Sequence, residues 1–177
     1  VAQKLGFDYR GIDQSSTHIE YCRERYPQGH FVAQDWDDHE GGYEVISFIS
    51  SLHHFDVWQK ALERAVCNLA PGGVILLDHE PNRLFSKLFR WYSLHVRRVD
   101  PEVIGSVEIH WFGRPSILPQ QLPEGRTVYH FDYFPGLQHL GLRTTNPMLG
   151  RFFESYRRII TQDEGLRWCE VHRAEIA

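Results

Sequence analysis

The chain has 177 residues, of which 42% are hydrophobic and 24% are charged, and its formal net charge is -4 at pH 7. This length fits one domain with its own core, and the charge excludes the strong positive excess that a nucleic-acid-binding protein needs. No apolar stretch approaches the roughly 20 residues of a membrane span, and no signal-peptide pattern opens the chain. We therefore expect a cytoplasmic protein.

The cysteines and histidines predict no metal site. Cys22, Cys67 and Cys169 are odd in number, widely spaced and without a CxxC pair, which argues against a disulfide framework and a zinc site. We expect three reduced thiols. The spacings of His110, His130 and His139 likewise match no metal-ligand pattern.

The first residues suggest that upstream sequence is missing. Val1 to Leu5 is typical of the last turn of a helix that ends at Gly6, and the only methionine is Met148. We therefore expect this chain to be a fragment of a longer one.

Strands and helices alternate from there on. A strand at Tyr9 to Ile12 ends in Asp13, a helix follows the caps at Ser15 to Thr17, and a second strand at Phe31 to Ala33 runs into Gln34 to Trp36. This alternation predicts an α/β fold with right-handed crossovers and a parallel sheet.

Residues 43 to 79 carry the strongest pattern in the sequence. The apolar run Val45 to Ile49 gives way to a polar turn at Ser50 to His54, a helix follows and ends at Leu69 to Gly73, and a second apolar run spans Val74 to Leu77. Neither run alternates, so we expect both to be buried on both faces. The polar turn then lies at the carboxyl edge of the sheet, where open α/β proteins bind ligands.

The second half has a different pattern. Pro81 to Val99 looks like an amphipathic helix that carries Arg83 and Lys87. Its basic residues suit a membrane surface, an acidic substrate or plain solvent, and we favour solvent. Residues 100–125 are rich in proline, which predicts an irregular excursion or lid.

Three further elements are expected toward the end of the chain. Arg126 to Phe134 alternates like a strand at the far edge of the sheet, and Leu149 to Thr161 has the spacing of a helix. Trp168 to Ala174 is the candidate for a last strand, antiparallel to its neighbour.

Four motifs together resemble a known family. Gly11 to Ser15, Gln34 to Trp36, Ser50 to Phe55 and Leu69 to Gly73 have the order and approximate spacing seen in class I S-adenosylmethionine-dependent methyltransferases, most closely the small-molecule branch. The resemblance covers roughly residues 1–80 and implies S-adenosyl-L-methionine as the cofactor. It also implies a Rossmann-like three-layer sandwich with a mostly parallel sheet and an antiparallel far edge.

The resemblance implies one partial domain over residues 1–177. Residues 1–80 would form its cofactor-binding half, and residues 81–177 would supply a substrate-side helix, a lid and final edge strands. Members of this family place a glycine-rich turn after their first strand, and this sequence begins beyond that turn. We therefore expect the 177 residues alone to bind S-adenosylmethionine weakly.

The cofactor-binding residues that the resemblance implies follow two strands and the polar turn. Asp13, with Gln14 beside it, would accept the ribose hydroxyls, because a strand-end carboxylate can take two hydrogen bonds. Asp35 and Trp36 would hold the adenine. Ser50 and Ser51 would lie near the methionine part of the cofactor. Ordinary structural roles, a helix cap for Asp13 and a surface turn for Asp35, are the alternatives.

A histidine near the carboxyl edge is the expected general base. Methyl transfer to oxygen or nitrogen requires alignment of the acceptor and removal of its proton, for which histidine is suited near neutral pH. His53 and His54 are the first candidates, although His54 fits a packing role equally well. His79, His110 and His130 are further candidates.

Other functional classes stay open at this point. A nicotinamide-dependent oxidoreductase also ends a strand in an acidic residue, although Asp35-Trp36 and the motifs at residues 50–55 and 69–73 have no particular reason to occur there. A non-catalytic binding partner with the same fold is the other alternative. We expect a small-molecule acceptor and no nucleic acid. Aromatic residues such as Trp111, Phe112 and Phe131 suit either an acceptor pocket or the core. Neither the acceptor nor the oligomeric state follows from the sequence.

Overall fold

The computed structural model describes residues 6–103, 117–131 and 140–176. The expected helical turn at Val1 to Leu5, and His110, Trp111, Phe112 and His139, lie outside these described residues. The chain forms two compact units, Val1–Gly41 and Gly42–Ala177.

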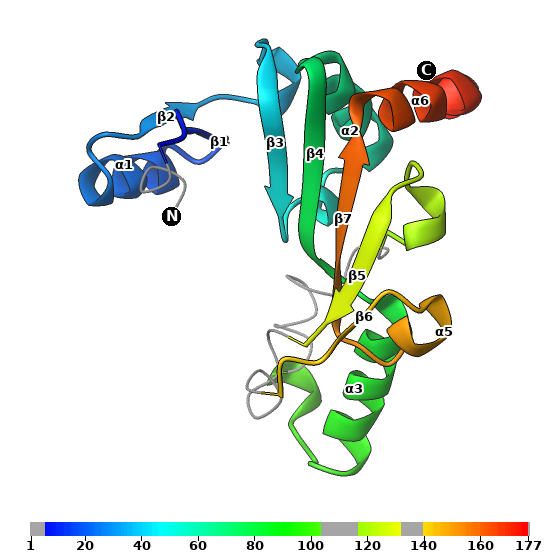
Figure 1. Cartoon of the computed structure of the whole chain (residues 1–177). Helices are drawn as coiled ribbons and strands as arrows, with labels where there is room; N and C mark the ends of the chain where they lie inside the picture. The colour runs from blue at the N-terminus through cyan, green and yellow to red at the C-terminus, as the bar shows by residue number, and fades with distance from the viewer. Residues whose placement is uncertain (1–5, 104–116, 132–139, 177) are drawn as a thin grey trace. The chain divides into compact units, whose positions relative to one another are not determined.

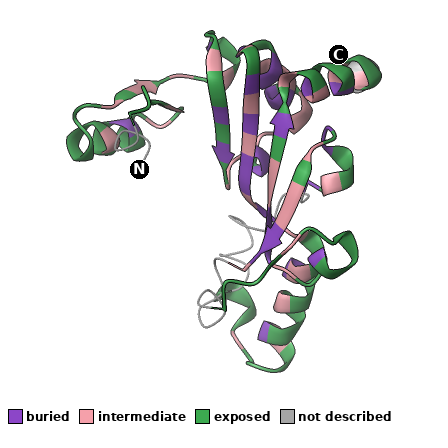
Figure 2. Ribbon diagram, viewed as in Figure 1, coloured by how far each residue is buried: buried purple, intermediate pink, exposed green. Residues whose placement is uncertain are grey.

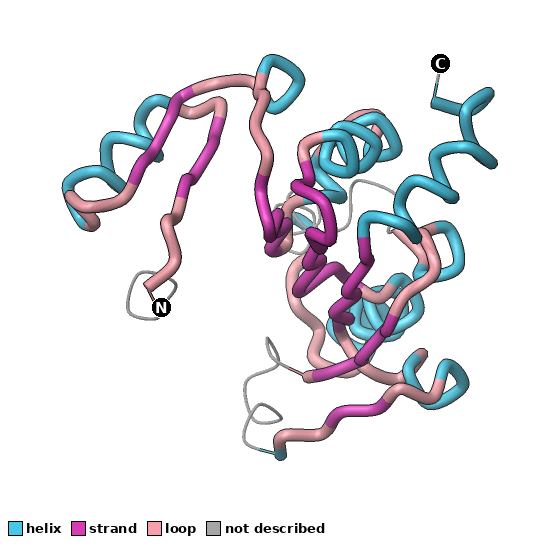
Figure 3. The backbone as a smooth tube through the Cα atoms, turned by 45° about the horizontal axis from the view of Figure 1, so that its top comes forward, coloured by secondary structure: helices cyan, strands magenta, loops and turns pink. Residues whose placement is uncertain are grey.

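The first unit is a strand, helix, strand motif. Strands β1 (Arg10–Asp13) and β2 (His30–Ala33) are parallel, with Asp13 opposite Ala33, and helix α1 (Ser16–Arg25) connects them. Ser15 caps α1 by accepting a hydrogen bond from the His18 amide at 3.3 Å. After β2, the short 3-10 helix η2 (Trp36–Asp38) begins. The predicted alternation is confirmed in this unit, and Figure 3 shows helix and strand following each other there.

A five-stranded sheet with the order β3-β4-β7-β5-β6 forms the second unit. Strands β3 (Tyr43–Ile49) and β4 (Leu69–Pro81) are parallel, and β7 (Ser155–Thr161) runs antiparallel between β4 and β5 (Arg126–His130) (Figure 1). The carboxyl ends of β3, β4 and β5 therefore meet the start of β7 at one edge of the sheet. This arrangement confirms the predicted α/β class with its antiparallel far side.

Several helical segments accompany this sheet in the described residues. Helices α2 (Trp58–Cys67) and α6 (Gln162–Ile176) pack on each other and on β4, while α3 (Arg83–His95) follows β4. The short segments are η3 (Leu52–His54), η4 (Pro119–Gln121) and α5 (Pro147–Gly150).

The core lies between the sheet and the pair of helices α2 and α6. Ile75, Leu77 and Ile160 are completely buried in the sheet, and Leu62 and Val66 are buried on α2 (Figure 2). Burial of this many branched apolar side chains is the main stabilising contribution available to the unit.

One prediction about β3 is wrong. Its apolar run was expected to be buried on both faces, but its residues alternate: Ile46 and Phe48 are buried, whereas Val45 is 50% and Ile49 is 59% exposed. The reason is positional, because β3 is an edge strand of the five-stranded sheet and pairs there with β4 on one side.

Two predictions near the end of the chain are also wrong. Residues 149–161 were expected to form a helix, but they contain the end of the four-residue α5 and the strand β7. Residues 168–174 were expected to form a strand, but they lie inside the 15-residue helix α6. The predicted strand at 126–134 ends at His130 where it is described, and the edge strand is β6 (Arg143–Thr144).

The glycine turn before the second apolar run has the predicted conformation. Gly72 has a φ of +77°, which a residue with a side chain rarely adopts. Tyr43 pairs with Leu69 and Val45 with Val74, so Pro71, Gly72 and Gly73 form a bulge inside β4. Pro71 to Gly73 therefore shapes the strand.

Three general features complete the fold. Cys22, Cys67 and Cys169 are free thiols. None of the helices in the described ranges has both the length and the apolar character needed to cross a membrane. Within those same ranges, no three His, Cys, Asp or Glu side chains are grouped so that they could hold a metal ion.

Candidate functional site

In the first unit, the residues predicted to bind the cofactor lie at the carboxyl edge of β1 and β2. The Gln34 amide donates to the carbonyl of Asp13 at 3.0 Å, and the side-chain Nε2 of Gln14 donates to Oδ2 of Asp35 at 2.7 Å. The loops after the two strands are therefore joined, and Asp13, Gln14 and Asp35 lie together.

Both carboxylates also shape their own loops. Oδ1 of Asp13 accepts the Ser15 amide at 2.8 Å, and Oδ1 of Asp35 accepts the Asp37 amide at 3.0 Å as the cap of η2. An ionised carboxylate offers about four acceptor positions, so each keeps capacity for hydroxyl or amino donors of a ligand. Asp13 and Asp35 are exposed, and this arrangement fits the polar edge of an adenosine group.

Trp36 adds an aromatic surface next to Asp35. Its ring is half-buried and stacks on His39, with ring centroids 5.8 Å apart and an interplanar angle of 26°. Such a fixed indole suits contact with a flat heterocycle.

The second unit carries the turn that follows β3. Ser50 has a φ of +51°, and its amide donates to the carbonyl of Asp78 at 2.8 Å. His79, the residue after Asp78 in the neighbouring strand, has a φ of +59°. Non-glycine residues in this region cost energy and concentrate at functional sites. The two strained positions lie at the carboxyl ends of adjacent parallel strands.

Glu80 holds this turn in place from inside the protein. Its side chain is completely buried: Oε1 accepts the amides of Ser51 at 3.3 Å and Leu52 at 3.1 Å, and Oε2 lies 2.8 Å from Nδ1 of His53. His53 is itself only 5% exposed, and its Nε2 has no hydrogen-bond partner among the described residues. His54 is exposed, with its ring centroid 4.2 Å from that of His53.

A group of charged and polar side chains surrounds Asp78 at the same edge; we call it the Asp78 cluster. Its members are Asp78, His79, His130, Ser155 and Arg157. Oδ2 of Asp78 accepts Nη2 of Arg157 at 2.6 Å, and Oδ1 lies 3.3 Å from Nδ1 of His79 and 3.5 Å from Nε2 of His130. Nδ1 of His130 lies 3.3 Å from Oγ of Ser155, and the two histidine rings meet edge-to-face at 5.1 Å.

The environment keeps Asp78 ionised. Burial alone would raise the pKa of its carboxyl, but the hydrogen bond from Arg157 and the nearby His79 and His130 outweigh burial and lower the pKa below 3.8. A carboxylate next to His79 can therefore orient the imidazole and stabilise the charge that it gains on accepting a proton.

Sequence reasoning found some members of this edge and missed others. His79 and His130 were candidates, but Asp78, Glu80 and Arg157 were not considered. A local signal existed for the two acids, because Asp78 and Glu80 interrupt the end of a buried apolar strand. No local signal marks Arg157, which reaches Asp78 only because β7 pairs with β4.

A methyltransferase domain family matches residues 1–112, which is more than half of the chain. No curated protein matches the chain at comparable stringency. The chain therefore belongs to the methyltransferase domain family, and it is a class I methyltransferase whose cofactor is S-adenosylmethionine.

Solved structures share the fold. One is an S-adenosylmethionine-dependent methyltransferase from Thermotoga maritima, described as a possible histamine N-methyltransferase, with 14% identity over 89% of this chain and 73% of that one, at a TM-score of 0.57. Another is the plantazolicin methyltransferase BpumL with a monoazolic desmethylPZN analog and SAH, with 17% identity over 89% and 67% of the chains and a TM-score of 0.57.

Proposed function

We propose that this chain transfers the methyl group of S-adenosylmethionine to an oxygen or nitrogen atom of a small molecule, and that His79 removes the proton of that atom. The observation that carries the proposal is the Asp78 cluster, in which a histidine with a strained backbone lies beside an ionised carboxylate at the carboxyl edge.

The chain offers two groups of contacts for the cofactor. Asp13 and Gln14 suit the ribose, Asp35 and Trp36 suit the adenine, and Ser50 and Ser51 suit the methionine part. When bound, the cofactor supplies a methyl carbon that its positive sulfur already activates. The remaining tasks for the protein are orientation of the acceptor and proton removal.

His79 suits the proton transfer better than His53 does. Nδ1 of His79 lies 3.3 Å from Oδ1 of Asp78, so Asp78 can stabilise the imidazolium that forms when the ring accepts the acceptor's proton. The side chain of His79 is 22% exposed, whereas that of His53 is 4% exposed and bonded to Glu80. His53 is accordingly a positioning residue that fixes the turn at Ser50 and Ser51.

A small-molecule acceptor is supported by two observations. One structural neighbour named above is described as a possible histamine N-methyltransferase, and the other was solved in complex with a monoazolic desmethylPZN analog. The chain also has a cavity of about 260 Å³ beside the end of β4.

The experiment is a transfer assay with tritiated S-adenosylmethionine and fractions of a small-molecule extract. We expect His79→Ala to slow transfer about 100-fold or more without changing S-adenosylhomocysteine affinity. We expect His53→Ala to lower thermal stability as well. His30→Ala is the control, because His30 is an exposed histidine at the opposite end of β2 from Asp35.

Two results would count against the proposal. Unchanged turnover by His79→Ala would remove His79 from the mechanism. Cofactor binding without transfer to any fraction would favour a non-catalytic binding module.

A further inference from the structure

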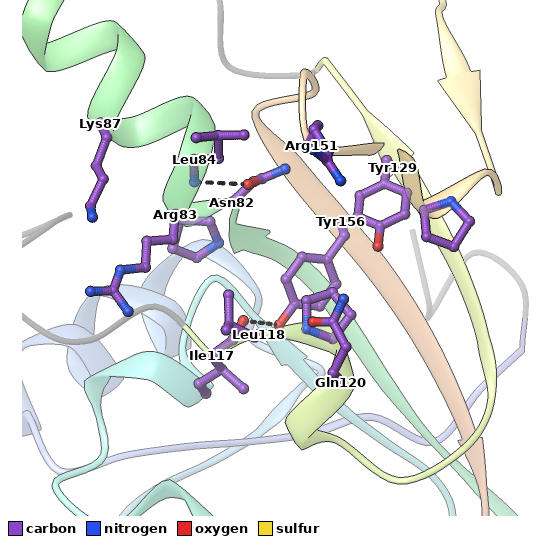
Figure 4. A pocket seen from close by; sticks show the side chains of 13 residues that line it. Asn82, Arg83, Leu84, Lys87, Ile117, Leu118, Gln120, Tyr129, Arg151 and Tyr156 are labelled. Carbon is purple, nitrogen blue, oxygen red and sulfur yellow. Dashed lines mark hydrogen bonds between the residues drawn. The ribbon is translucent and has the colours of Figure 1, made fainter. Parts of the chain in front are cut away.

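A cavity of about 260 Å³ opens where β4 passes into α3 (Figure 4). This volume lies just below the range of about 300 to 1,000 Å³ that is common for small-molecule sites. Its walls include Arg83, Lys87, Arg151, Ile117, Tyr129 and Tyr156.

Among the residues that the structure describes, three cationic side chains and no acidic ones line the cavity. Arg83 and Lys87 are four residues apart on α3, and Arg151 follows α5; in Figure 4 the first two lie on one side of the cavity and Arg151 on another. All three are exposed, and within the described residues none of them makes an ion pair or a hydrogen bond through its side chain. Their charge is therefore available to a ligand, in a chain whose net charge is -4.

Asn82 links the two segments that carry the cationic side chains, α3 and the end of α5. Its Oδ1 caps α3 by accepting the Leu84 amide at 3.0 Å, and its Nδ2 donates to the carbonyl of Gly150 at 2.8 Å. Arg83 directly follows Asn82 in the chain, and Arg151 directly follows Gly150. The separation between the cationic sides is thus fixed by the fold before any ligand arrives.

The floor of the cavity is aromatic and neutral. Tyr156 is completely buried and donates its hydroxyl to the carbonyl of Ile117 at 2.8 Å, and its ring meets that of Tyr129 edge-to-face at 6.3 Å. Burial raises the pKa of Tyr156 well above its ordinary value, so its phenol stays uncharged. The cavity therefore combines an apolar floor with a positive rim.

The cavity is connected to the proposed catalytic edge through Glu80. Tyr156 lies opposite Glu80 in the sheet register, and Pro81, another wall residue, directly follows Glu80. Glu80 in turn binds the Ser51 and Leu52 amides and His53. Pro81, which a molecule in the cavity would contact, is therefore the next residue in the chain after Glu80, and Glu80 fixes the turn after β3.

We infer that this cavity recognises the anionic group, a carboxylate or a phosphate, of a methyl acceptor that also has an apolar part. The assignment of this molecule as the acceptor rests on the proposed function. Charge-assisted hydrogen bonds from arginine and lysine suit either anion, and the tyrosine floor suits the apolar part. A basic helix face that is merely solvated would not need cations from two separate segments around an aromatic floor.

The test measures binding of three soluble probes to the whole chain by NMR titration: benzoate, phenyl phosphate and the neutral benzamide. We expect one or both anions to bind more tightly than benzamide. Arg83→Gln, Lys87→Gln and Arg151→Gln should each weaken anion binding about 3- to 10-fold, and the triple variant should abolish it. The stronger of the two anions identifies the group that is recognised.

Lys60→Gln and Arg167→Gln are matched controls, because both are exposed cations on α2 and α6 that do not line the cavity. We expect them to bind the anions as the wild type does. Separate titration with S-adenosylhomocysteine distinguishes the two proposals: loss of anion binding in the triple variant supports the cavity assignment even if the cofactor proposal fails.

Three outcomes would overturn the inference. The first is equal affinity of the wild type for the anions and for benzamide. The second is unchanged anion affinity in the triple variant. The third is that neither soluble anion binds, while the three cations are needed for sedimentation with anionic phospholipid vesicles. The last result would assign the basic residues to a membrane surface.

Discussion

At the residue scale, Asp78 connects three strands of the second unit. It belongs to β4, it accepts a hydrogen bond from Arg157 of β7, and it lies within ion-pair distance of His130 at the end of β5. Its side chain is only 10% exposed, so its contacts are less screened by solvent than those of a surface ion pair.

Replacing Asp78 should lower stability in a pH-dependent way. We expect Asp78→Asn to reduce the free energy of unfolding at pH 7 by about 1 to 3 kcal/mol, since it removes a charge-assisted hydrogen bond from a buried position. The folded-state pKa of Asp78 is lowered from 3.8, so its contribution is complete above pH 3.8 and is lost as the pH falls through the lowered value.

Urea unfolding between pH 7 and pH 3 measures this effect. The difference between wild type and Asp78→Asn should be constant near neutral pH and should shrink below pH 3.8. Glu170→Gln, an exposed acid on α6, should show no such difference. A gap between Asp78→Asn and wild type that stays constant down to pH 3 would contradict the role assigned to Asp78.

At the element scale, β7 and α6 show why local patterns failed near the end of the chain. Residues 149–161 have helical spacing, but Tyr156 and Ile160 are buried on one face of β7 because β4 and β5 pair with it on both sides. Long-range pairing of this kind overrides local preference and leaves no trace in a short window.

The start of α6, in contrast, had a readable signal. The amide of Thr161 donates to Oε2 of Glu164 at 2.7 Å, and the Glu164 amide donates back to Oγ1 of Thr161 at 3.4 Å. Thr161 and Glu164 have the spacing of a capping box, which predicts a helix start at this point.

Gly165 tests the packing of α6 on α2. A Cβ built at this position would lie 2.5 Å from Cγ2 of Val66, closer than side-chain carbons approach each other. We expect Gly165→Ala to lower the free energy of unfolding by about 1 to 3 kcal/mol, although alanine favours helices by about 1 kcal/mol over glycine.

A double-mutant cycle with Val66→Ala separates packing from other causes. Removing the valine methyls makes room, so the cost of Gly165→Ala should largely disappear in the Val66→Ala background. Chemical denaturation followed by circular dichroism measures all four proteins. A stabilising Gly165→Ala in the Val66 background would show that the two helices do not pack as described.

At the scale of the whole molecule, the order of the motifs was more informative than any single residue. The four motifs at residues 11–15, 34–36, 50–55 and 69–73 predicted the family, the cofactor and the parallel arrangement, because each lies at the start or the end of a strand. The division into a cofactor-binding half and a substrate-side half at residue 80 stays a prediction.

The parts that sequence reasoning did not reach depend on tertiary contacts. Glu80 bonds to a turn that lies 27 to 29 residues away in the sequence, and Arg157 contacts an acid 79 residues away. The cationic cavity likewise combines α3 with the segment after α5. Residues that become neighbours only through sheet pairing carry no spacing rule that a single sequence reveals.

Titration of the isotope-labelled chain with S-adenosylhomocysteine, followed by NMR, tests the central claim most directly, because it detects affinities as weak as millimolar and reports their location. We predict amide shift changes in three segments, residues 13–15, 35–37 and 50–52, and none there with NADH. Shifts confined to other residues, or equal responses to NADH, would contradict the assignment of these three segments to S-adenosylmethionine binding.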